Sequence, residues 1–212
     1  MNIFLTGGTG YIGQRLIPLL AAKGHKIQAL TRKESLSKLP TGCLPIIGNA
    51  LDKSTFTDQI KPAETFIQLV GVAHPSPSKG KEFRTIDLVS GRESVAAAAA
   101  AGIKHFIYVS IAQPAPMMKD YIAARTEVES LIQSNDMNAT ILRPWYVLGP
   151  GHRWPYLLLP AYWIAERIPV TSESAQRLGL VTLAQMLRAL VHAVDMPPRG
   201  IKILEVPAIR ST

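Results

Sequence analysis

TGGTGYIG, at residues 6–13, stands between the short apolar run Asn2–Leu5 and the amphipathic run Gln14–Ala22. The first run is typical of a buried strand, and the apolar residues of the second recur at helical spacing. The glycines spell G-x-G-x-x-G from Gly8 and G-x-x-G-x-x-G from Gly7. In either register the turn is tight, a pyrophosphate can approach the backbone, and a helix N-terminus faces the anion. We therefore predict a strand, a dinucleotide-binding turn and a helix; the alternative is a glycine-rich turn without a ligand.

The remainder of the chain alternates strand-like and helix-like segments. Strands are predicted at residues 25–30, 43–47, 65–70, 105–110 and 139–142, and helices at residues 83–101 and 121–133. This alternation is typical of βαβ units with right-handed crossovers, and apolar strands such as FIQLV suit a sheet that is covered on both faces. The predicted fold class is α/β, with a doubly wound, mainly parallel sheet of the Rossmann type. Ligands of such sheets bind at the carboxyl ends of the strands.

The pattern changes after Pro144. Prolines and aromatic residues crowd residues 145–169, which hold all three tryptophans, and a helix at residues 183–194 and a last strand at residues 201–206 follow. We expect two parts: a dinucleotide-binding domain at residues 1–150, and a small C-terminal lobe at residues 151–212 that packs on it as a substrate lid.

Length and composition restrict the class of protein. The chain has 212 residues, 47% of them hydrophobic, which suits one sizeable folded unit. The net charge of +8 comes from scattered cations, so a solvated surface is favoured and no nucleic-acid partner is expected. No apolar run reaches the roughly 18 residues that span a bilayer, and no signal-peptide pattern opens the chain. The single cysteine, Cys43, excludes an intrachain disulfide and fits a cytoplasmic protein.

Several motifs, taken together, resemble a known family. They are TGGTGYIG at residues 6–13, GNALD at 48–52, YVS at 108–110, YIAAR at 121–125, RPWYVLGPG at 143–151 and LVTLAQMLRALVHAV at 180–194. In this order they resemble the atypical or extended short-chain dehydrogenases/reductases, the NAD(P)-binding proteins of the sugar-epimerase-like and NmrA-like kind. Family members of the extended type carry larger substrate domains, so the resemblance implies a small or incomplete substrate site here.

The resemblance implies a dinucleotide site along the carboxyl ends of the strands. The residues implied in cofactor binding are Gly7, Gly10, Tyr11, Ile12 and Gly13 at the pyrophosphate, Asn49 and Ala50 beside the adenine, Leu69, Val70 and Gly71 beneath the ribose, Arg125 at the ribose, and Pro144 near the nicotinamide. None of these is a metal ligand, and the histidines of the chain show no metal-ligand spacing, so no metal site is predicted.

The family's catalytic pattern is a tyrosine followed four residues later by a lysine, with a serine upstream. Here Ser110 and Tyr121 match, but Arg125 replaces the lysine. Residues four apart share a helix face, so Arg125 is expected to reach the ribose and to lower the pKa of Tyr121 by its fixed charge. Tyr121 would then exchange a proton with a substrate oxygen that Ser110 orients, while the cofactor carries the hydride. The alternative is an ordinary amphipathic helix face, with a serine that caps a strand end.

The second predicted strand runs into Thr31, Arg32 and Lys33 rather than into an acid. An acid at this place binds the ribose hydroxyls of NAD, whereas an arginine faces the 2′-phosphate of NADP. Glu34 follows and is expected to point away from the site or to pair with a neighbour. The predicted cofactor is NADP, with NAD as the alternative; in the competing interpretation the two cations are only surface charge.

Three functions are open from the sequence. The first is a small NADP-dependent oxidoreductase that acts on a small carbonyl or alcohol substrate. The second is a non-catalytic dinucleotide-binding protein, a redox sensor or an assembly factor for a larger complex, which Arg125 in place of lysine favours. The third is a peripheral membrane protein that handles a quinone or lipid, suggested by RWPYLLLPAYWIAERIP at residues 153–169. The sequence specifies neither the substrate nor the oligomeric state.

Overall fold

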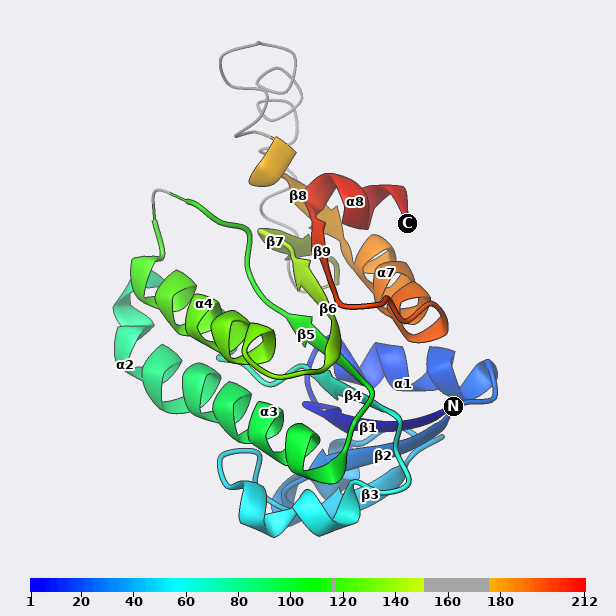
Figure 1. The fold of residues 1–212 in the computed structure, drawn as a ribbon. Coiled ribbons are helices and arrows are strands. Elements are labelled where there is room, and N and C mark those ends of the chain that lie inside the picture. The colour runs from blue at the N-terminus through cyan, green and yellow to red at the C-terminus, as the bar shows by residue number, and fades with distance from the viewer. Residues whose placement is uncertain (116, 151–175) are drawn as a thin grey trace.

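A seven-stranded parallel sheet forms the centre of the protein in the computed structural model, which describes residues 1–115, 117–150 and 176–212 (Figure 1). The strand order is β3-β2-β1-β4-β5-β6-β9, and every pairing is parallel. Its strands are β1 Asn2–Thr6, β2 Lys26–Thr31, β3 Leu44–Ile47, β4 Thr65–Gln68, β5 His105–Val109, β6 Asn138–Arg143 and β9 Ile201–Glu205. A separate parallel pair joins β7 (Tyr146–Leu148) to β8 (Leu180–Thr182). The predicted doubly wound α/β fold is thus confirmed.

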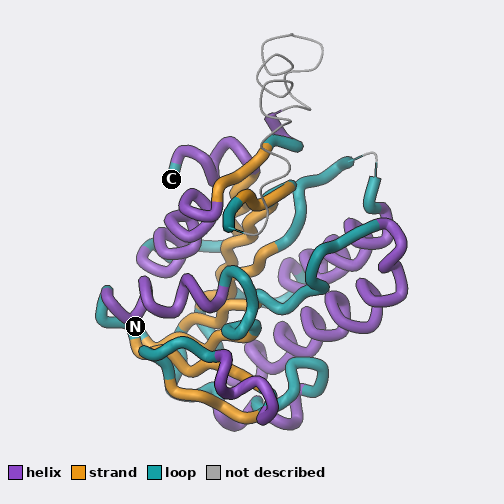
Figure 2. The backbone as a smooth tube through the Cα atoms, turned by 180° about the vertical axis from the view of Figure 1, so that it is seen from behind, coloured by secondary structure: helices purple, strands orange, loops and turns teal. Residues whose placement is uncertain are grey.

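Helices cover both faces of the sheet, as the front and rear views show (Figures 1 and 2). One face carries α1 (Gly13–Ala22), α7 (Leu183–Asp195) and α8 (Val206–Ser211). The opposite face carries α3 (Val89–Ala101) and α4 (Lys119–Gln133). The short helix α2 runs through a π-helical turn into α3, so the helix predicted at residues 83–101 begins with wider turns. The remaining short elements are α2 Gly80–Glu82, the π-helical turn Phe83–Leu88, and 3-10 turns at Lys33–Lys38, Lys53–Thr55, Thr57–Gln59 and Pro77–Lys79.

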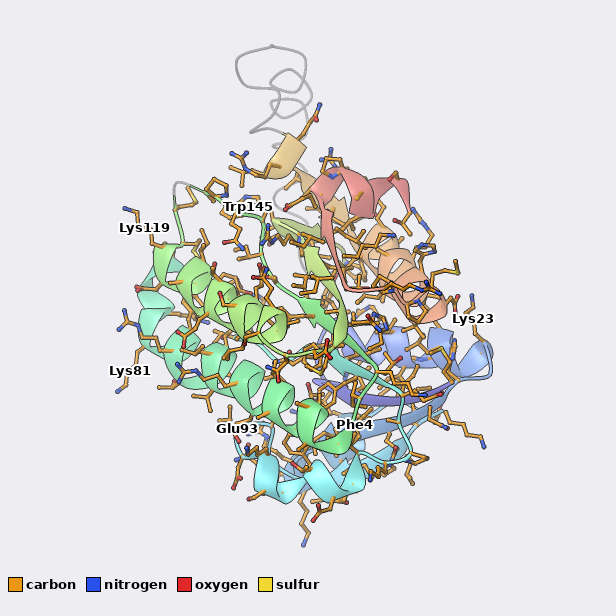
Figure 3. All side chains as sticks on the ribbon, viewed as in Figure 1. Phe4, Lys23, Lys81, Glu93, Lys119 and Trp145 are labelled. Carbon is orange, nitrogen blue, oxygen red and sulfur yellow. The ribbon has the colours of Figure 1, made fainter. Side chains whose placement is uncertain are left out.

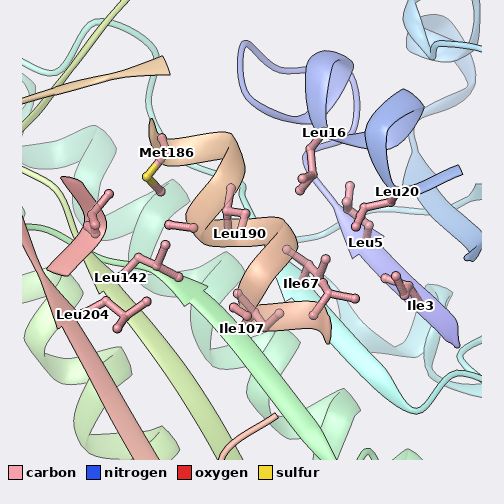
Figure 4. Packing of buried hydrophobic residues seen from close by; sticks show 14 of the residues in the cluster. Ile3, Leu5, Leu16, Leu20, Ile67, Ile107, Leu142, Met186, Leu190 and Leu204 are labelled. Carbon is pink, nitrogen blue, oxygen red and sulfur yellow. The ribbon is translucent and has the colours of Figure 1, made fainter. Parts of the chain in front are cut away.

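Alternate side chains of the strands fill two separate cores. Ile3 and Leu5 of β1 point towards α1 and α7, where they join the cluster drawn in Figure 4. Phe4, Phe66 and Phe106 point to the other face, and neighbouring ring centroids in this row lie 5.2 Å apart. Burying a side chain of this size contributes about 1.5–3 kcal/mol, so both layers hold the sheet and fix the positions of its strand ends.

The strand order reverses between β1 and β4, which lie side by side at the centre of the sheet. The chain leaves β1 towards β2 on one side and leaves β4 towards β5 on the other. Loops that diverge at such a point leave a crevice at the carboxyl ends of the strands. The glycine turn after β1 and the segment 69–71 after β4 therefore flank the place where a ligand of this fold binds.

The last strand completes the main sheet. β9 pairs with β6 from Ala139–Ile201 to Arg143–Glu205. Met186 and Leu190 of α7 pack in the same core as α1, so residues 180–212 supply part of one helix layer as well (Figure 4). The predicted division at residue 150 stays a prediction, because residues 151–175, including the aromatic segment at 153–169, lie outside the described residues.

The described ranges contain no helix with the length and apolar character needed to cross a bilayer. In the same ranges no group of three or more His, Cys, Asp or Glu side chains is placed to hold a metal ion. The cytoplasmic location, the expected lack of a nucleic-acid partner and the peripheral membrane alternative stay predictions.

His105 gives the fold a pH-dependent stability. Its ring is buried between β5 and β6 with Nε2 2.9 Å from Oγ1 of Thr140, and burial lowers its pKa from 6.5 to about 4. Between these values the unfolded chain binds a proton that the folded chain does not bind, so stability should fall as the pH drops from 6.5 towards 4. We expect a loss of up to about 3 kcal/mol in urea titrations. His105→Gln should abolish this component, and an unchanged pH dependence in that variant would contradict the assignment.

Candidate active site

Two cavities adjoin at the carboxyl ends of the central strands. The first, of about 340 Å³, lies over the ends of β1, β2 and β4. The second, of about 330 Å³, lies over the ends of β4, β5 and β6. Gly7, Gly10, Leu69 and Gly71 line both cavities, which therefore meet at the point where the strand order reverses. Both volumes are in the range of small-molecule sites.

The glycine turn is packed so closely that it requires glycine at its ends. Gly7 has a φ of +79°, and a Cβ there would lie 2.8 Å from the carbonyl carbon of Leu69. A Cβ on Gly13 would lie 2.7 Å from Cα of Gly8. The N–H of Gly10 donates to the Gly7 carbonyl at 3.0 Å and closes the turn. Since α1 begins at Gly13, its N-terminus faces the cavities, and this bare cradle fits a dinucleotide pyrophosphate.

Gly10 offers a substitution that separates binding from folding. An added Cβ there meets only the Gly7 carbonyl oxygen, at 3.2 Å, and otherwise extends towards the cavities that Gly10 lines. We expect Gly10→Val to keep the fold and to lose dinucleotide affinity by about 10- to 150-fold for each charge-assisted hydrogen bond that is lost. Calorimetric titration with NADP measures the loss, and circular dichroism checks the fold. Unchanged affinity would mean that the pyrophosphate does not bind at this turn.

The first cavity collects the residues expected at the adenosine end. Those that line it are Thr31, Arg32, Asn49, Ala50, Leu69, Val70 and Gly71. Lys33 is exposed, begins the 3-10 turn, and is not part of this lining. The side chain of Arg32 is 68% exposed, and its Nε lies 3.4 Å from Oε1 of Glu34. An exposed pair of this kind contributes about 0–1 kcal/mol, so a phosphate can displace Glu34 from Arg32.

The second cavity collects the residues expected at the nicotinamide end. Ser110, Tyr121 and Arg125 share its wall, although they come from the end of β5 and from α4. The other predicted residues that line it are Tyr11, Ile12 and Pro144. Trp145, which follows Pro144, also lines it and is labelled in Figure 3. The fold thus gathers the three catalytic candidates around one space, next to the glycine turn.

Arg125 is held by partners within the protein. Nη2 donates to the buried carboxylate of Asp87 at 2.5 Å, and the two side chains are 5% and 0% exposed. Nη1 donates to the carbonyl oxygen of Val109 at 2.8 Å and lies 3.4 Å from the hydroxyl of Tyr108. The guanidinium therefore has a fixed place in the cavity wall. Its predicted contact with a ribose stays a prediction.

The environment of Tyr121 differs from the expectation. The guanidinium carbon of Arg125 lies 5.0 Å from the centroid of its ring, and this charge lowers the pKa of Tyr121 as predicted. Burial of the phenol raises the pKa by more, and the negative charge of Asp87 raises it further. The net direction is upward, so Tyr121 is protonated at neutral pH rather than poised to ionise. The physical reason is that the low-dielectric site disfavours the phenolate.

Ser110 belongs to a second buried network. Its hydroxyl donates to Oε1 of Glu129, a carboxylate that also accepts from Gln113 at 3.2 Å. Arg143 approaches the same carboxylate with Nε at 3.1 Å and with Nη2, and it reaches Glu205 with Nη1 at 2.9 Å. Because its hydroxyl donates to Glu129, the Ser110 oxygen can only accept a hydrogen bond from a ligand in the cavity that Ser110 lines. This network fixes the serine oxygen at the end of β5.

Two residues of the site were missed in the sequence, Asp87 and Glu129. For each of them, the helical spacing of the sequence indicates that the side chain faces the protein interior. Phe83, Asp87, Ser90 and Ser94 share one buried face, so the aspartate faces the sheet. Glu129 lies four residues after Arg125 and therefore faces the strand ends as Arg125 does. An acid on a buried helix face requires a partner, which indicates an ion pair even where the partner cannot be named.

Comparison with known proteins agrees with this geometry. The NAD(P)H-binding family model matches residues 7–153 of the chain. The chain is 26% identical over 210 residues to a ceramide reductase of Caulobacter vibrioides. This alignment covers 98% of the chain and 62% of the reductase. The chain is also 24% identical over 223 residues to the UDP-glucose 4-epimerase of Vibrio cholerae, in an alignment that covers 92% of the chain and 67% of the epimerase.

Solved structures match the fold over nearly the whole chain. MoeE5 in complex with UDP-glucuronic acid and NAD superposes with a TM-score of 0.73 at 20% identity, over 97% of the chain and 76% of that protein. The Bordetella bronchiseptica enzyme WbmH in complex with NAD⁺ gives a TM-score of 0.71 at 20% identity, over 96% of this chain and 75% of that protein. With the matched residues 7–153 covering the glycine turn and both cavities, the chain belongs to the NAD(P)H-binding family of atypical, epimerase-like short-chain dehydrogenases/reductases.

Proposed function

We propose that this protein is an NADP-dependent oxidoreductase that acts on a small carbonyl or alcohol substrate. The observation that carries the cofactor choice is Arg32, which lines the first cavity directly after β2 where an acid would select NAD. Thr31 lines the same cavity and offers a hydroxyl to the same phosphate. The observation that supports chemistry is the shared wall of Ser110 and Tyr121 in the second cavity.

The roles of the chain's own residues follow from the two cavities. The turn at residues 7–13 would hold the pyrophosphate, and the first cavity would hold the adenosine. Bound NADP would supply hydride transfer, the step that side chains cannot perform. Tyr121 would exchange a proton with the substrate oxygen, and Ser110, whose own proton is engaged, would accept a hydrogen bond from a substrate hydroxyl. Residues 72–75 and 144–147 also line this cavity and would enclose the substrate.

Relatives support an oxidoreductase without fixing its substrate. A ketoreductase of Stigmatella aurantiaca is 25% identical over 171 residues and a denitrifying reductase of a Streptomyces species is 26% identical over 177 residues. The chain spans 51% and 58% of the length of these two proteins. Their substrates differ widely in size and chemistry, and so do the lipid and sugar substrates named for the other relatives. We therefore assign the reaction class and leave the substrate as a small carbonyl or alcohol.

Arg32→Asp tests the cofactor choice. If Arg32 grips the 2′-phosphate, a charge-assisted contact of about 1.5–3 kcal/mol gives NADP a roughly 10- to 150-fold advantage over NAD. The variant should lose that advantage while its NAD affinity stays nearly constant. Calorimetric titrations of both proteins with both dinucleotides measure this. The matched control is Lys33→Asp, which changes the adjacent charge outside the cavity lining. Equal affinity of the wild type for NAD and NADP would show that the cofactor is misassigned.

A non-catalytic dinucleotide sensor is the second candidate. The observation that favours it is the ion pair of Arg125 with Asp87, which replaces a mobile lysine near the tyrosine by a fixed, charge-balanced group. The two functions make different predictions. A sensor binds NADP but consumes no NADPH with any of a panel of small aldehydes and ketones, whereas an oxidoreductase consumes NADPH with at least one of them.

A further inference from the structure

Asp87 is a buried carboxylate next to the catalytic candidates. It comes from the π-helical turn Phe83–Leu88, and its Oδ1 accepts from Arg125. Its Oδ2 accepts from the backbone N–H of Val72 at 3.1 Å. A Cβ at Gly71 would overlap Arg125 and would lie 3.0 Å from Oδ1 of Asp87. The ion pair is thus pressed against the backbone that separates the two cavities, and Asp87 can change the electrostatics of the site without contacting a substrate.

The groups that face Tyr121 come from three elements. Arg125 lies one turn along α4, with its guanidinium carbon 5.0 Å from the ring centroid. Phe83 of the π-helical turn packs on the ring with centroids 4.6 Å apart, and Asp87 lies one turn beyond it. Tyr108 of β5 lies behind Arg125.

Two further titratable side chains, His74 and Tyr146, line the same cavity as Tyr121. Arg125 and Asp87 form the ion pair of this set and carry opposite signs; burial raises the pKa of Asp87, and the contact with Arg125 lowers it.

A lone guanidinium at this distance would favour the phenolate of Tyr121. The same guanidinium in contact with a carboxylate is one half of an ion pair, so Asp87 offsets part of the effect that Arg125 has on the neighbouring Tyr121. Burial then decides the protonation of the phenol, and the pKa of Tyr121 is raised. A tyrosine that keeps its proton can donate it, whereas a phenolate would have to accept one. The resting protonation state of Tyr121 therefore depends in part on Asp87.

We propose that Asp87 offsets the charge of Arg125 beside Tyr121, so that the phenol of Tyr121 rests in its protonated form and is ready to donate to a carbonyl oxygen. This inference rests on the proposed function and assigns Asp87 a part in it. Bound NADPH would supply the hydride to the carbonyl carbon and would leave as NADP⁺. The π electrons of the C=O bond move to the oxygen, which takes the phenolic proton of Tyr121. The tyrosine regains its proton from solvent. Asp87 touches no reacting atom and acts as a positioning residue through Arg125.

The test is a spectrophotometric tyrosinate titration of the protein without cofactor. Subtracting the titration of Tyr121→Phe from that of the wild type isolates Tyr121, which should show no ionisation up to about pH 10. The same subtraction is made for Asp87→Asn, using the double variant Asp87→Asn/Tyr121→Phe as the reference. In Asp87→Asn, Tyr121 should ionise at least about one pH unit lower than in the wild type. Glu127→Gln, which removes a half-exposed carboxylate of α4 paired with Arg92, is the matched control and should resemble the wild type. An Asp87→Asn titration that matches the wild type would overturn the proposal.

A second variant keeps the test decisive if Asp87→Asn does not fold with its unpaired buried guanidinium. Asp87→Asn/Arg125→Met removes both charges, and Tyr121 should then titrate as in the wild type. If Tyr121 ionises earlier in the wild type than in this double variant, the charge of Arg125 is not offset and the proposal is wrong. The titration uses neither cofactor nor substrate. If the protein does not bind NADP, the proposed function is wrong, but the Tyr121 titration is unaffected. If the Tyr121 titration overturns the role of Asp87, NADP binding and turnover can still be measured.

Discussion

Replacing Tyr121 with phenylalanine should lower turnover by about 10²-fold or more and leave NADP affinity nearly unchanged. The phenylalanine keeps the ring that packs on Phe83 at 4.6 Å and loses only the hydroxyl. The variant lacks the proposed proton donor, so the barrier of the proposed reaction should rise while the dinucleotide site remains. Stopped-flow or steady-state NADPH consumption with the best carbonyl substrate of the panel measures the effect.

Tyr146→Phe is the matched control for this prediction, because it removes another tyrosine hydroxyl from the wall of the same cavity. Its turnover should stay far closer to that of the wild type. Equal turnover of Tyr121→Phe and the wild type would remove Tyr121 from the mechanism. Equal losses in the two variants would mean that the cavity needs its hydroxyls for structure rather than for proton transfer.

Arg143→Met should destabilise the protein by about 3–5 kcal/mol. Arg143 is a cation in contact with Glu129, whose side chain is 3% exposed. Its removal leaves this buried carboxylate, among the described residues, with the Ser110 hydroxyl and the Gln113 amide as its side-chain partners. Such a loss is a large part of the stability of an ordinary domain. Urea unfolding followed by fluorescence or circular dichroism gives the difference in the free energy of unfolding.

An exposed ion pair supplies the control. Arg84 and Asp120 pair at 3.0 Å with side chains that are 72% and 51% exposed. Arg84→Met should therefore change stability by only about 0–1 kcal/mol. If Arg143→Met costs no more than Arg84→Met, Glu129 is not held as a buried ion, and the fixed orientation of Ser110 has another cause.

The parts of the fold that were predictable depend on local patterns. TGGTGYIG predicts a strand end, a turn and a helix start because glycine is required at Gly7, where an added Cβ would lie 2.8 Å from the carbonyl carbon of Leu69. Apolar runs locate the central strands because a sheet covered on both faces buries the side chains on both sides of these strands, as in β4. The place of β9 was not predictable in this way. Ala139 and Ile201, which it pairs, are far apart in the chain, and no local spacing states which strand a late apolar run will join.

In the candidate site, too, the features that follow from local spacing were predictable and the contacts between distant residues were not. The Tyr121–Arg125 relation was predictable because residues four apart share a helix face, and the gathering of Gly7, Ser110 and Tyr121 was predictable because parallel strands end at one edge. The partners of these residues were not. Asp87 meets Arg125 across 38 positions and Ser110 meets Glu129 across 19, through packing of different elements. The raised pKa of Tyr121 depends on burial and on the charges of Arg125 and Asp87, so the motif alone could not predict it.

A crystal structure with NADP tests the central claim most directly. The account predicts the adenosine in the first cavity with its 2′-phosphate on Arg32, the pyrophosphate on the turn at residues 7–13, and the nicotinamide beside Tyr121 and Ser110 in the second cavity. A dinucleotide whose 2′-phosphate lies away from Arg32 would contradict the choice of NADP. A nicotinamide outside the cavity of Tyr121, or crystals grown with saturating NADP that contain no dinucleotide, would contradict the proposed oxidoreductase as a whole.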